Sequence, residues 1–197
     1  MKRRAAFLDR DGVVNLDREY VHRIEDFAFV PGVFEAARVL RRMGFLLVVT
    51  TNQSGIGRGL YDVPQFNMLT DWMKQRFLDE GAELGGVYFC PHHPTAALLP
   101  YRHACSCRKP GPGMLLAAAS DLDLVLGASA MFGDRPSDLE AARRAGVPAR
   151  YLLGTDAAGM PAEPSDPELA TGRFASLLDA VSSEEFGRFA ALPALEP

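Results

Sequence analysis

Residues 45–55 have the sequence FLLVVTTNQSG, and this stretch decides the fold class. Its first seven residues, Phe45–Thr51, form a continuous apolar and β-branched run, which is typical of a strand buried on both faces of a parallel sheet. Immediately before this run, apolar residues recur at helical spacing over residues 31–43, and Gly44 suits the end of such a helix. The stretch therefore predicts a helix that leads into a central parallel strand.

The same alternation of strand-like and helix-like segments extends along the rest of the chain. Strands are expected at residues 5–8, 45–51, 87–89, 128–132 and 150–153, and helices at residues 31–43, 64–78, 112–122 and 136–145. Such alternation favours an α/β fold with a parallel sheet. Residues 174–191 are expected to form surface helices without a chemical role.

A length of 197 residues favours a single domain that spans residues 1–197. The sequence contains no internal repeat and no clear domain boundary. Residues 154–167 are rich in Pro, Gly, Ala and Asp and are expected to be a loop, and residues 192–197 are expected to be a loose tail.

The charge balance is slightly acidic, with 21 Lys and Arg against 25 Asp and Glu and a net charge of -4. The chain therefore has no strong basic field that would attract nucleic acid or anionic lipid. It also lacks the run of about 18 apolar residues that a membrane span needs, and its basic start is followed by too short an apolar stretch for a signal peptide. We expect a soluble, cytoplasmic protein that is a monomer and acts on a small molecule.

Two carboxylates, Asp9 and Asp11, follow the first expected strand in the sequence DRDG. Residues two apart in an extended chain point to the same side, and open α/β sheets bind ligands beyond the carboxyl ends of their strands. Two close carboxylates repel each other unless a cation or a shared proton offsets their charge, and Mg²⁺ prefers oxygen ligands. The same four residues are also typical of a turn, so the other strand ends must decide between the two interpretations.

The other strand ends add groups that suit a phosphate. Thr51–Gly55 offers a hydroxyl, two amides and backbone N–H groups for an oxyanion. Arg108 and Lys109 are two adjacent cations that could neutralise a phosphate, although adjacent cations are more often a solvated pair. Asp134 ends the fourth expected strand and is the better metal ligand, whereas Asp138 falls in the first turn of the next helix and suits capping.

A loop after the third expected strand is rich in metal-ligating side chains. The chain has three cysteines, all in this region: Cys90, Cys105 and Cys107. Three cysteines cannot all pair with one another, and three Cys with one His match a closed structural zinc site. Three histidines compete for the fourth position: His92, His93 and His103.

In their order and separations, four segments resemble the four motifs of the haloacid dehalogenase (HAD) superfamily of phosphatases: Phe7–Val13, Thr51–Asn52, Lys109–Pro110 and Gly133–Asp134. The match runs over about residues 5–153. This resemblance implies a Rossmann-like HAD fold, in which helices cover both faces of the parallel sheet and a zinc-binding loop occupies about residues 90–107.

Within that superfamily, further segments resemble the D-glycero-D-manno-heptose-1,7-bisphosphate 7-phosphatases and their near relatives, the histidinol-phosphate phosphatases: Tyr20–His22, Thr51–Ile56, Cys90–Pro94 and Cys107–Pro110. The resemblance implies a Mg²⁺-dependent phosphatase that removes the 7-phosphate of the heptose bisphosphate through an aspartyl-phosphate. That reaction is a step towards nucleotide-activated heptose and the lipopolysaccharide core.

The resemblance also assigns the catalytic roles. Asp9 is expected to attack phosphorus, and Asp11 to protonate the leaving sugar oxygen and later to activate water. Thr51 and Lys109 are expected to hold the phosphoryl group. Mg²⁺ is expected to bind Asp9, the main-chain carbonyl of Asp11, and Asp134.

The substrate contacts implied by the resemblance are Asp17, Arg18, Glu19, Tyr20, Asn52, Gln53, Ser54, Arg108 and Arg135. The implied zinc ligands are Cys90, His92, Cys105 and Cys107. Zinc bound there would stiffen a loop that covers the site and ends at Arg108 and Lys109. Two positions depart from the family pattern, because Val13 replaces a common Thr and Arg135 replaces a common Lys.

Two other functions fit parts of this pattern. A histidinol-phosphate phosphatase would use the same chemistry, but residues 17–20 and His22 fit the heptose type better. A non-enzymatic, zinc-stabilised binding module is the second alternative. The acidic charge and the complete set of expected catalytic residues argue against it.

Overall fold

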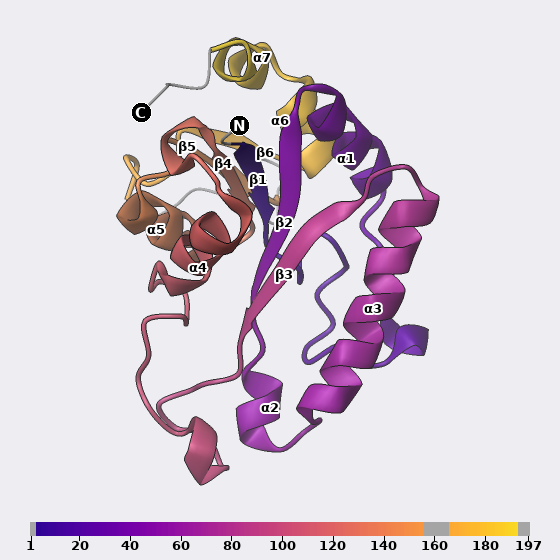
Figure 1. Cartoon of the computed structure of the whole chain (residues 1–197), viewed down its shortest axis with the longest axis vertical. Helices are drawn as coiled ribbons and strands as arrows, with labels where there is room; N and C mark the ends of the chain where they lie inside the picture. Colours follow the sequence, from indigo (N-terminus) through magenta and orange to yellow (C-terminus); the bar gives the residue numbers. More distant parts are fainter. Residues whose placement is uncertain (1–2, 156–165, 193–197) are drawn as a thin grey trace.

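The computed structural model describes residues 3–155 and 166–192. The loop expected at residues 154–167 and the tail expected at residues 192–197 lie largely outside the described residues. Within the described part, six strands form one sheet in the order β3-β2-β1-β4-β5-β6, and all neighbouring strands are parallel (Figure 1). The predicted α/β fold with a parallel sheet is therefore confirmed.

The strands are β1 (Arg4–Leu8), β2 (Phe45–Asn52), β3 (Leu84–Cys90), β4 (Ala130–Gly133), β5 (Ala149–Leu153) and β6 (Gly172–Phe174). The helices are α1 (Val33–Arg42), α2 (Ser54–Arg58), α3 (Val63–Asp79), α4 (Gly113–Leu122), α5 (Pro136–Ala145), α6 (Leu177–Ser182) and α7 (Glu184–Ala190). Short 3-10 helices are η1 (Ile24–Asp26), η2 (Leu99–Tyr101) and η3 (Leu126–Ala128). In these ranges no helix is long and apolar enough to cross a membrane.

Helices cover both faces of the sheet, as expected (Figure 1). In β1, Ala6 and Leu8 join the core formed with α1, α3, α6 and α7. The alternate residues Ala5 and Phe7 join the core formed with α4 and α5. Because successive side chains of a strand point to opposite faces, a strand between two helical layers must be apolar throughout. This requirement explains the unbroken apolar runs in β1 and β2.

Helix α3, predicted at residues 64–78, begins at Val63 for a local reason that involves its N-cap residue, Asp62. The Asp62 carboxylate accepts a hydrogen bond from the backbone N–H of Gln65 at 2.8 Å, and the Gln65 side chain accepts one from the N–H of Asp62 at 2.9 Å. This reciprocal pair satisfies two N–H groups at the start of α3. The apolar stripe of α3 then packs against the sheet through Leu69, Met73 and Phe77.

Several elements differ from the sequence-based expectation. Strand β4 begins two residues later than predicted, because residues 126–128 form a 3-10 helix. The three-residue edge strand β6 and the five-residue helix α2 are too short to give a periodic pattern. Predicting α6 and α7 as surface helices was wrong in part, because Leu177 and Phe186 are buried in the main core.

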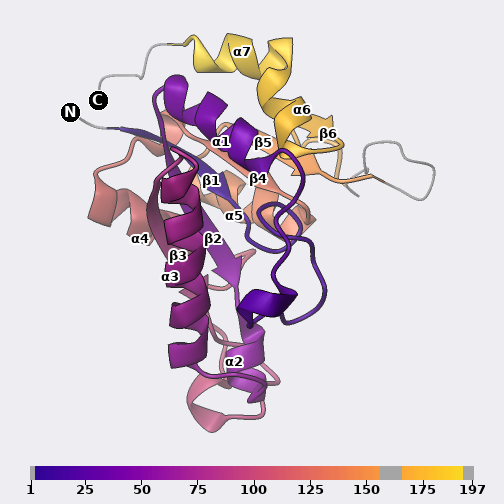
Figure 2. The ribbon, with the colours of Figure 1, turned by 90° about the vertical axis from the view of Figure 1, so that its right-hand side faces the viewer.

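The carboxyl ends of the strands point towards one end of the molecule, where α2 and the loop between β3 and α4 lie together (Figure 2). The backbone N–H of Leu98 in that loop donates to the carbonyl of Gly57 in α2 at 2.9 Å. The chain order reverses beside β1, since β2 and β3 lie on one side of it and β4 on the other. In open α/β sheets this reversal point is where ligands bind.

Candidate active site

The strand ends enclose a cavity of about 580 Å³. Its lining includes almost all of the residues predicted to catalyse or bind substrate: Asp9, Asp11, Asp17, Glu19, Tyr20, Thr51, Asn52, Gln53, Ser54, Arg108, Lys109 and Arg135. Arg18, an expected substrate contact, is not among the lining residues. The lining also contains residues that the sequence did not single out as site residues: Arg10, Tyr61, Pro110, Ser137 and Asp138.

Lys109 lies at the centre of a buried ion-pair network. Its ammonium group is 2.9 Å from Asp9 Oδ1 and 2.7 Å from Asp138 Oδ1, and it donates to the carbonyl of Thr50 at 2.8 Å. Burial acts to lower the pKa of Lys109, but the two carboxylates outweigh it and raise that pKa above the ordinary value. The ammonium group is therefore positively charged and fixed beside Asp9. Asp138 also accepts from the backbone N–H of Arg135 at 3.0 Å, so the predicted capping role is confirmed.

Asp9 and Asp134 form a carboxylate pair that favours a cation. Burial raises the pKa of Asp9, with Lys109 acting in the opposite direction, and burial also raises the pKa of Asp134 to about 6. Carboxylate oxygens of Asp9, Asp134 and Asp138 lie within 4.8 Å of one another. Oδ1 of Asp134 is buried and has no hydrogen-bond partner among the described residues. A divalent cation would satisfy this oxygen and offset the charge.

Gly12 allows Asp134 to approach the first loop. It has φ = +90°, and a Cβ atom built on it would lie 2.2 Å from Asp134 Oδ2. Any other residue would therefore meet both an unfavourable backbone conformation and a collision with the carboxylate. The glycine of the DRDG sequence thus has a steric role in bringing the ends of β1 and β4 together.

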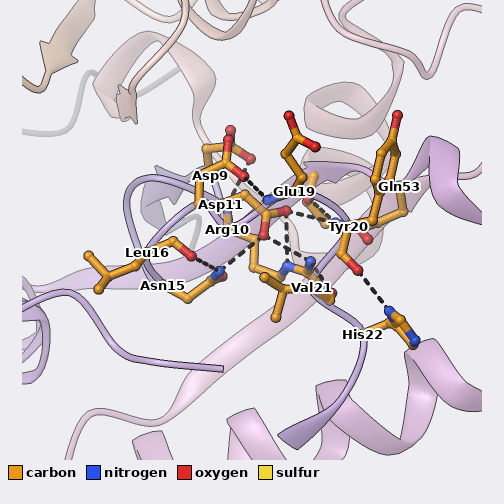
Figure 3. A network of polar contacts seen from close by, with 12 residues as sticks. Asp9, Arg10, Asp11, Asn15, Leu16, Glu19, Tyr20, Val21, His22 and Gln53 are labelled. Atoms are coloured by element: carbon orange, nitrogen blue, oxygen red, sulfur yellow. Dashed lines mark hydrogen bonds and ion pairs between the residues drawn. The ribbon is translucent and has the colours of Figure 1, made fainter. Parts of the chain in front are cut away.

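Asp11 is held by a set of four donated hydrogen bonds (Figure 3). Arg10 donates through Nη2 to Oδ1 at 2.9 Å and through Nε to Oδ2 at 3.2 Å. Asn15 Nδ2 donates to Oδ1, and Gln53 Nε2 donates to Oδ2, both at 3.1 Å. The Arg10 guanidinium is almost fully buried and also donates to the carbonyl of Val21 at 2.8 Å. The Asp11 side chain is thereby oriented by residues from two separate loops.

Two amides at the end of β2 connect the expected catalytic residues. Asn52 Nδ2 donates to the carbonyl of Lys109, and Asn52 Oδ1 accepts from the Lys109 N–H, both at 3.1 Å. Gln53 Nε2 donates to Thr51 Oγ1 at 2.7 Å as well as to Asp11. Asn52 therefore positions the backbone of the loop that carries Lys109, and Gln53 links Thr51 to Asp11.

The mouth of the cavity is formed by the loop after β1 and the start of α5. Arg135 Nη2 pairs with Asp17 Oδ2 at 2.7 Å and thereby joins these two segments. Glu19 and Tyr20 both have positive φ angles, 55° and 53°, which is unusual for residues with a side chain. Backbone strain of this kind concentrates at functional sites.

The Cys/His cluster lies in the loop between β3 and α4. Cys107 Sγ is 3.1 Å from the sulfur atoms of both Cys90 and Cys105, and 3.3 Å from His92 Nδ1. All four ligand atoms lie within 4.8 Å of one another. Ligands of a tetrahedral zinc ion with Zn–S bonds of about 2.3 Å would be separated by roughly 3.7 Å. The donor set and its spacing are therefore compatible with zinc.

The other two histidines of the loop lie outside this cluster. The His103 ring packs against the His92 ring at a tilt of 45° with centroids 4.2 Å apart, and His93 Nδ1 accepts from the N–H of Thr95 at 3.2 Å. Arg108 Nη1 donates to the carbonyl of His92 at 3.3 Å, which connects the cluster to the cavity lining. Among the three candidates for the fourth ligand, the geometry thus favours His92.

Comparisons with known proteins agree with this geometry. A family described as HAD-hydrolase-like matches residues 106–168. The D-glycero-beta-D-manno-heptose-1,7-bisphosphate 7-phosphatase of Escherichia coli (strain K12) is 46% identical over 175 residues, which are 89% of this chain and 90% of the relative. The D-glycero-alpha-D-manno-heptose-1,7-bisphosphate 7-phosphatase of Burkholderia mallei is 52% identical over 153 residues, 78% of this chain and 81% of the relative.

One solved structure is similar to this chain over most of its length. The D,D-heptose 1,7-bisphosphate phosphatase from B. bronchiseptica, complexed with magnesium and phosphate, superposes with a TM-score of 0.77 and 32% sequence identity. The match covers 90% of this chain and 96% of that one.

Proposed function

Since the chain belongs to the D-glycero-D-manno-heptose-1,7-bisphosphate 7-phosphatase family of HAD phosphatases, we propose that it removes the 7-phosphate from the heptose 1,7-bisphosphate. The observation that carries this proposal is the buried Lys109 between Asp9 and Asp138, with Asp134 beside them. A charged ammonium group and a carboxylate pair suited to a cation are the two parts that phosphoryl transfer needs next to a nucleophile.

Asp9 is the proposed nucleophile. One of its carboxylate oxygens forms a bond to phosphorus as the bond between phosphorus and the sugar oxygen breaks, which leaves an aspartyl-phosphate. Asp11 gives a proton to the departing sugar oxygen. It then takes a proton from the water that attacks phosphorus in the aspartyl-phosphate. The bond between phosphorus and the Asp9 oxygen breaks in this second step, which frees Asp9 and releases inorganic phosphate. Lys109 and the hydroxyl of Thr51 offset the charge of the phosphoryl oxygens in both steps.

The magnesium ligands are proposed to be Asp9, Asp134 and the main-chain carbonyl of Asp11. The unpartnered, buried Oδ1 of Asp134 supports this choice. Asp138 is also close, but its two oxygens are engaged by Lys109 and by the N–H of Arg135. Magnesium bound there would neutralise the phosphoryl oxygens and fix the phosphate for in-line attack.

Substrate recognition is proposed to involve the outer part of the cavity. Arg108 and Arg135 are two cations that line it beyond the Lys109 network, and Asp17 and Glu19 can accept hydrogen bonds from sugar hydroxyls. Zinc held by Cys90, His92, Cys105 and Cys107 would fix the loop that ends at Arg108. Arg18 stays a prediction as a substrate contact, and so do the monomeric state and the cytoplasmic location.

The proposal is tested by comparing phosphate release from three substrates in the presence of Mg²⁺. These are the α-anomer and the β-anomer of the heptose bisphosphate, and histidinol phosphate. Both anomers are needed because relatives named for each are similarly close to this chain. We expect kcat/KM for one anomer to exceed that for histidinol phosphate by at least about tenfold, which a few polar contacts can provide. Preference for histidinol phosphate would contradict the proposed substrate and leave the proposed chemistry intact.

A further inference from the structure

Tyr61, in the segment between α2 and α3, is part of the cavity lining and is nearly fully buried. Its hydroxyl donates to Gln53 Oε1 at 2.6 Å, the shortest contact that the Gln53 side chain makes. Burial raises the pKa of Tyr61 to about 12. The hydroxyl is therefore protonated at neutral pH and acts as a donor to the amide oxygen.

This contact fixes which way the Gln53 amide faces. A side-chain amide has one accepting oxygen and one donating nitrogen, and the two ends have nearly the same shape. With its oxygen on Tyr61, Gln53 presents its NH₂ group to Asp11 Oδ2 at 3.1 Å and to Thr51 Oγ1 at 2.7 Å. The reversed amide would place its oxygen against the Asp11 carboxylate, where two acceptors would face each other.

The surroundings are built to hold the Tyr61 ring. A Cβ atom on Gly55 would lie 2.2 Å from Tyr61 Cε1, so the glycine leaves the space that the ring fills. On another side the His22 ring stacks on Tyr61 with centroids 4.9 Å apart and planes at 6°. His22 is itself held by a 2.8 Å hydrogen bond between Nδ1 and the carbonyl of Tyr20, in the strained segment at the cavity mouth. Two separate segments, α2 and the loop after β1, thus hold the ring whose hydroxyl meets Gln53.

We propose that Tyr61 is a positioning residue for the reaction, because its hydroxyl locks the Gln53 amide in the orientation that holds the Asp11 carboxylate and the Thr51 hydroxyl. Tyr61 acts through Gln53 and makes no contact with the reacting atoms in this role. The inference rests on the proposed role of Asp11 as the acid and base of the phosphatase reaction.

The test is a double-mutant cycle with Tyr61→Phe and Gln53→Ala, measured as kcat and KM for the preferred heptose bisphosphate anomer. Tyr61→Phe removes only the hydroxyl and keeps the ring that fills the space beside Gly55. We expect kcat to fall roughly 2- to 10-fold, the effect of one hydrogen bond, with KM unchanged. In the Gln53→Ala background the same change should alter kcat by less than about twofold, because the residue through which Tyr61 acts is gone.

A matched control is Tyr101→Phe. Tyr101 and Tyr61 both line a second cavity, and the Tyr101 hydroxyl has no hydrogen-bond partner among the residues that the structure describes. This variant should keep the wild-type kcat, and melting temperatures should show that all variants fold. A wild-type kcat for Tyr61→Phe, an effect confined to KM, or an equal loss in the Gln53→Ala background would each overturn the inference. Failure of the unmodified enzyme to release phosphate would instead overturn the proposed function.

Discussion

Replacing Asp9 with Asn should reduce phosphate release by roughly 10³-fold or more while the fold is kept, since the loss of a nucleophile removes the covalent route entirely. The variant keeps the shape of the side chain and removes only its charge. In the folded protein the negative charge of Asp9 is repelled by the charges of Asp134 and Asp138. In the variant Lys109 keeps its ion pair with Asp138, which is 2.7 Å long. The melting temperature should therefore stay close to that of the unmodified protein.

The measurement is continuous detection of inorganic phosphate with saturating Mg²⁺, together with a thermal melt of each variant. Asp71→Asn is the matched control, because it makes the same chemical change on the exposed side of α3. That control should retain full activity. An Asp9→Asn variant with more than a few per cent of the wild-type rate would contradict the proposed aspartyl-phosphate, because the remaining carboxylates would then have to support the reaction.

Replacing Cys107 with Ser should abolish the proposed zinc binding and lower kcat by about 10²-fold, although Cys107 does not line the cavity. The physical link is short. Cys107 immediately precedes Arg108 and Lys109, and the Lys109 backbone is held by two reciprocal hydrogen bonds to Asn52. If the loop is released at Cys107, the Lys109 ammonium group can shift away from Asp9, and small displacements of a catalytic group are costly.

Zinc is measured by metal analysis of protein that has been purified without a chelator, and activity is measured in parallel. We expect about one zinc per chain in the unmodified protein and almost none in Cys107→Ser. His92→Ala should behave like Cys107→Ser, whereas His103→Ala should retain zinc, because His103 lies outside the cluster of ligand atoms. An unmodified protein without zinc, or a Cys107→Ser variant with full activity, would show that the cluster does not organise the active site.

The parts of this protein that could be predicted from its sequence are those encoded locally. An unbroken apolar run such as Phe45–Thr51 suits only a doubly covered strand, and Asp62 with Gln65 is a local signal for a helix start. Parallel strands bring their carboxyl ends to one edge, so Asp9 and Asp134 could be expected to meet although 125 positions separate them. Here fold and site follow from one pattern.

The parts that could not be predicted depend on tertiary partners. Arg10 lies between two expected catalytic residues, but only the folded chain turns its guanidinium inwards to hold Asp11. Tyr61 has no motif around it, and its hydroxyl meets Gln53 because Gly55 leaves room for the ring. Strand β6 and helix α7 are likewise too short to give a recognisable periodic pattern. Their positions depend on packing in the core around Phe186.

We propose that this chain hydrolyses the phosphate at position 7 of the heptose and leaves the phosphate at position 1. Phosphorus NMR of the heptose 1,7-bisphosphate, recorded during incubation with the enzyme and Mg²⁺, follows both phosphates at once. We expect the resonance of the 7-phosphate to be replaced by that of inorganic phosphate while the 1-phosphate stays attached to the sugar. Loss of the 1-phosphate, or two unchanged resonances with an active enzyme, would contradict this expectation.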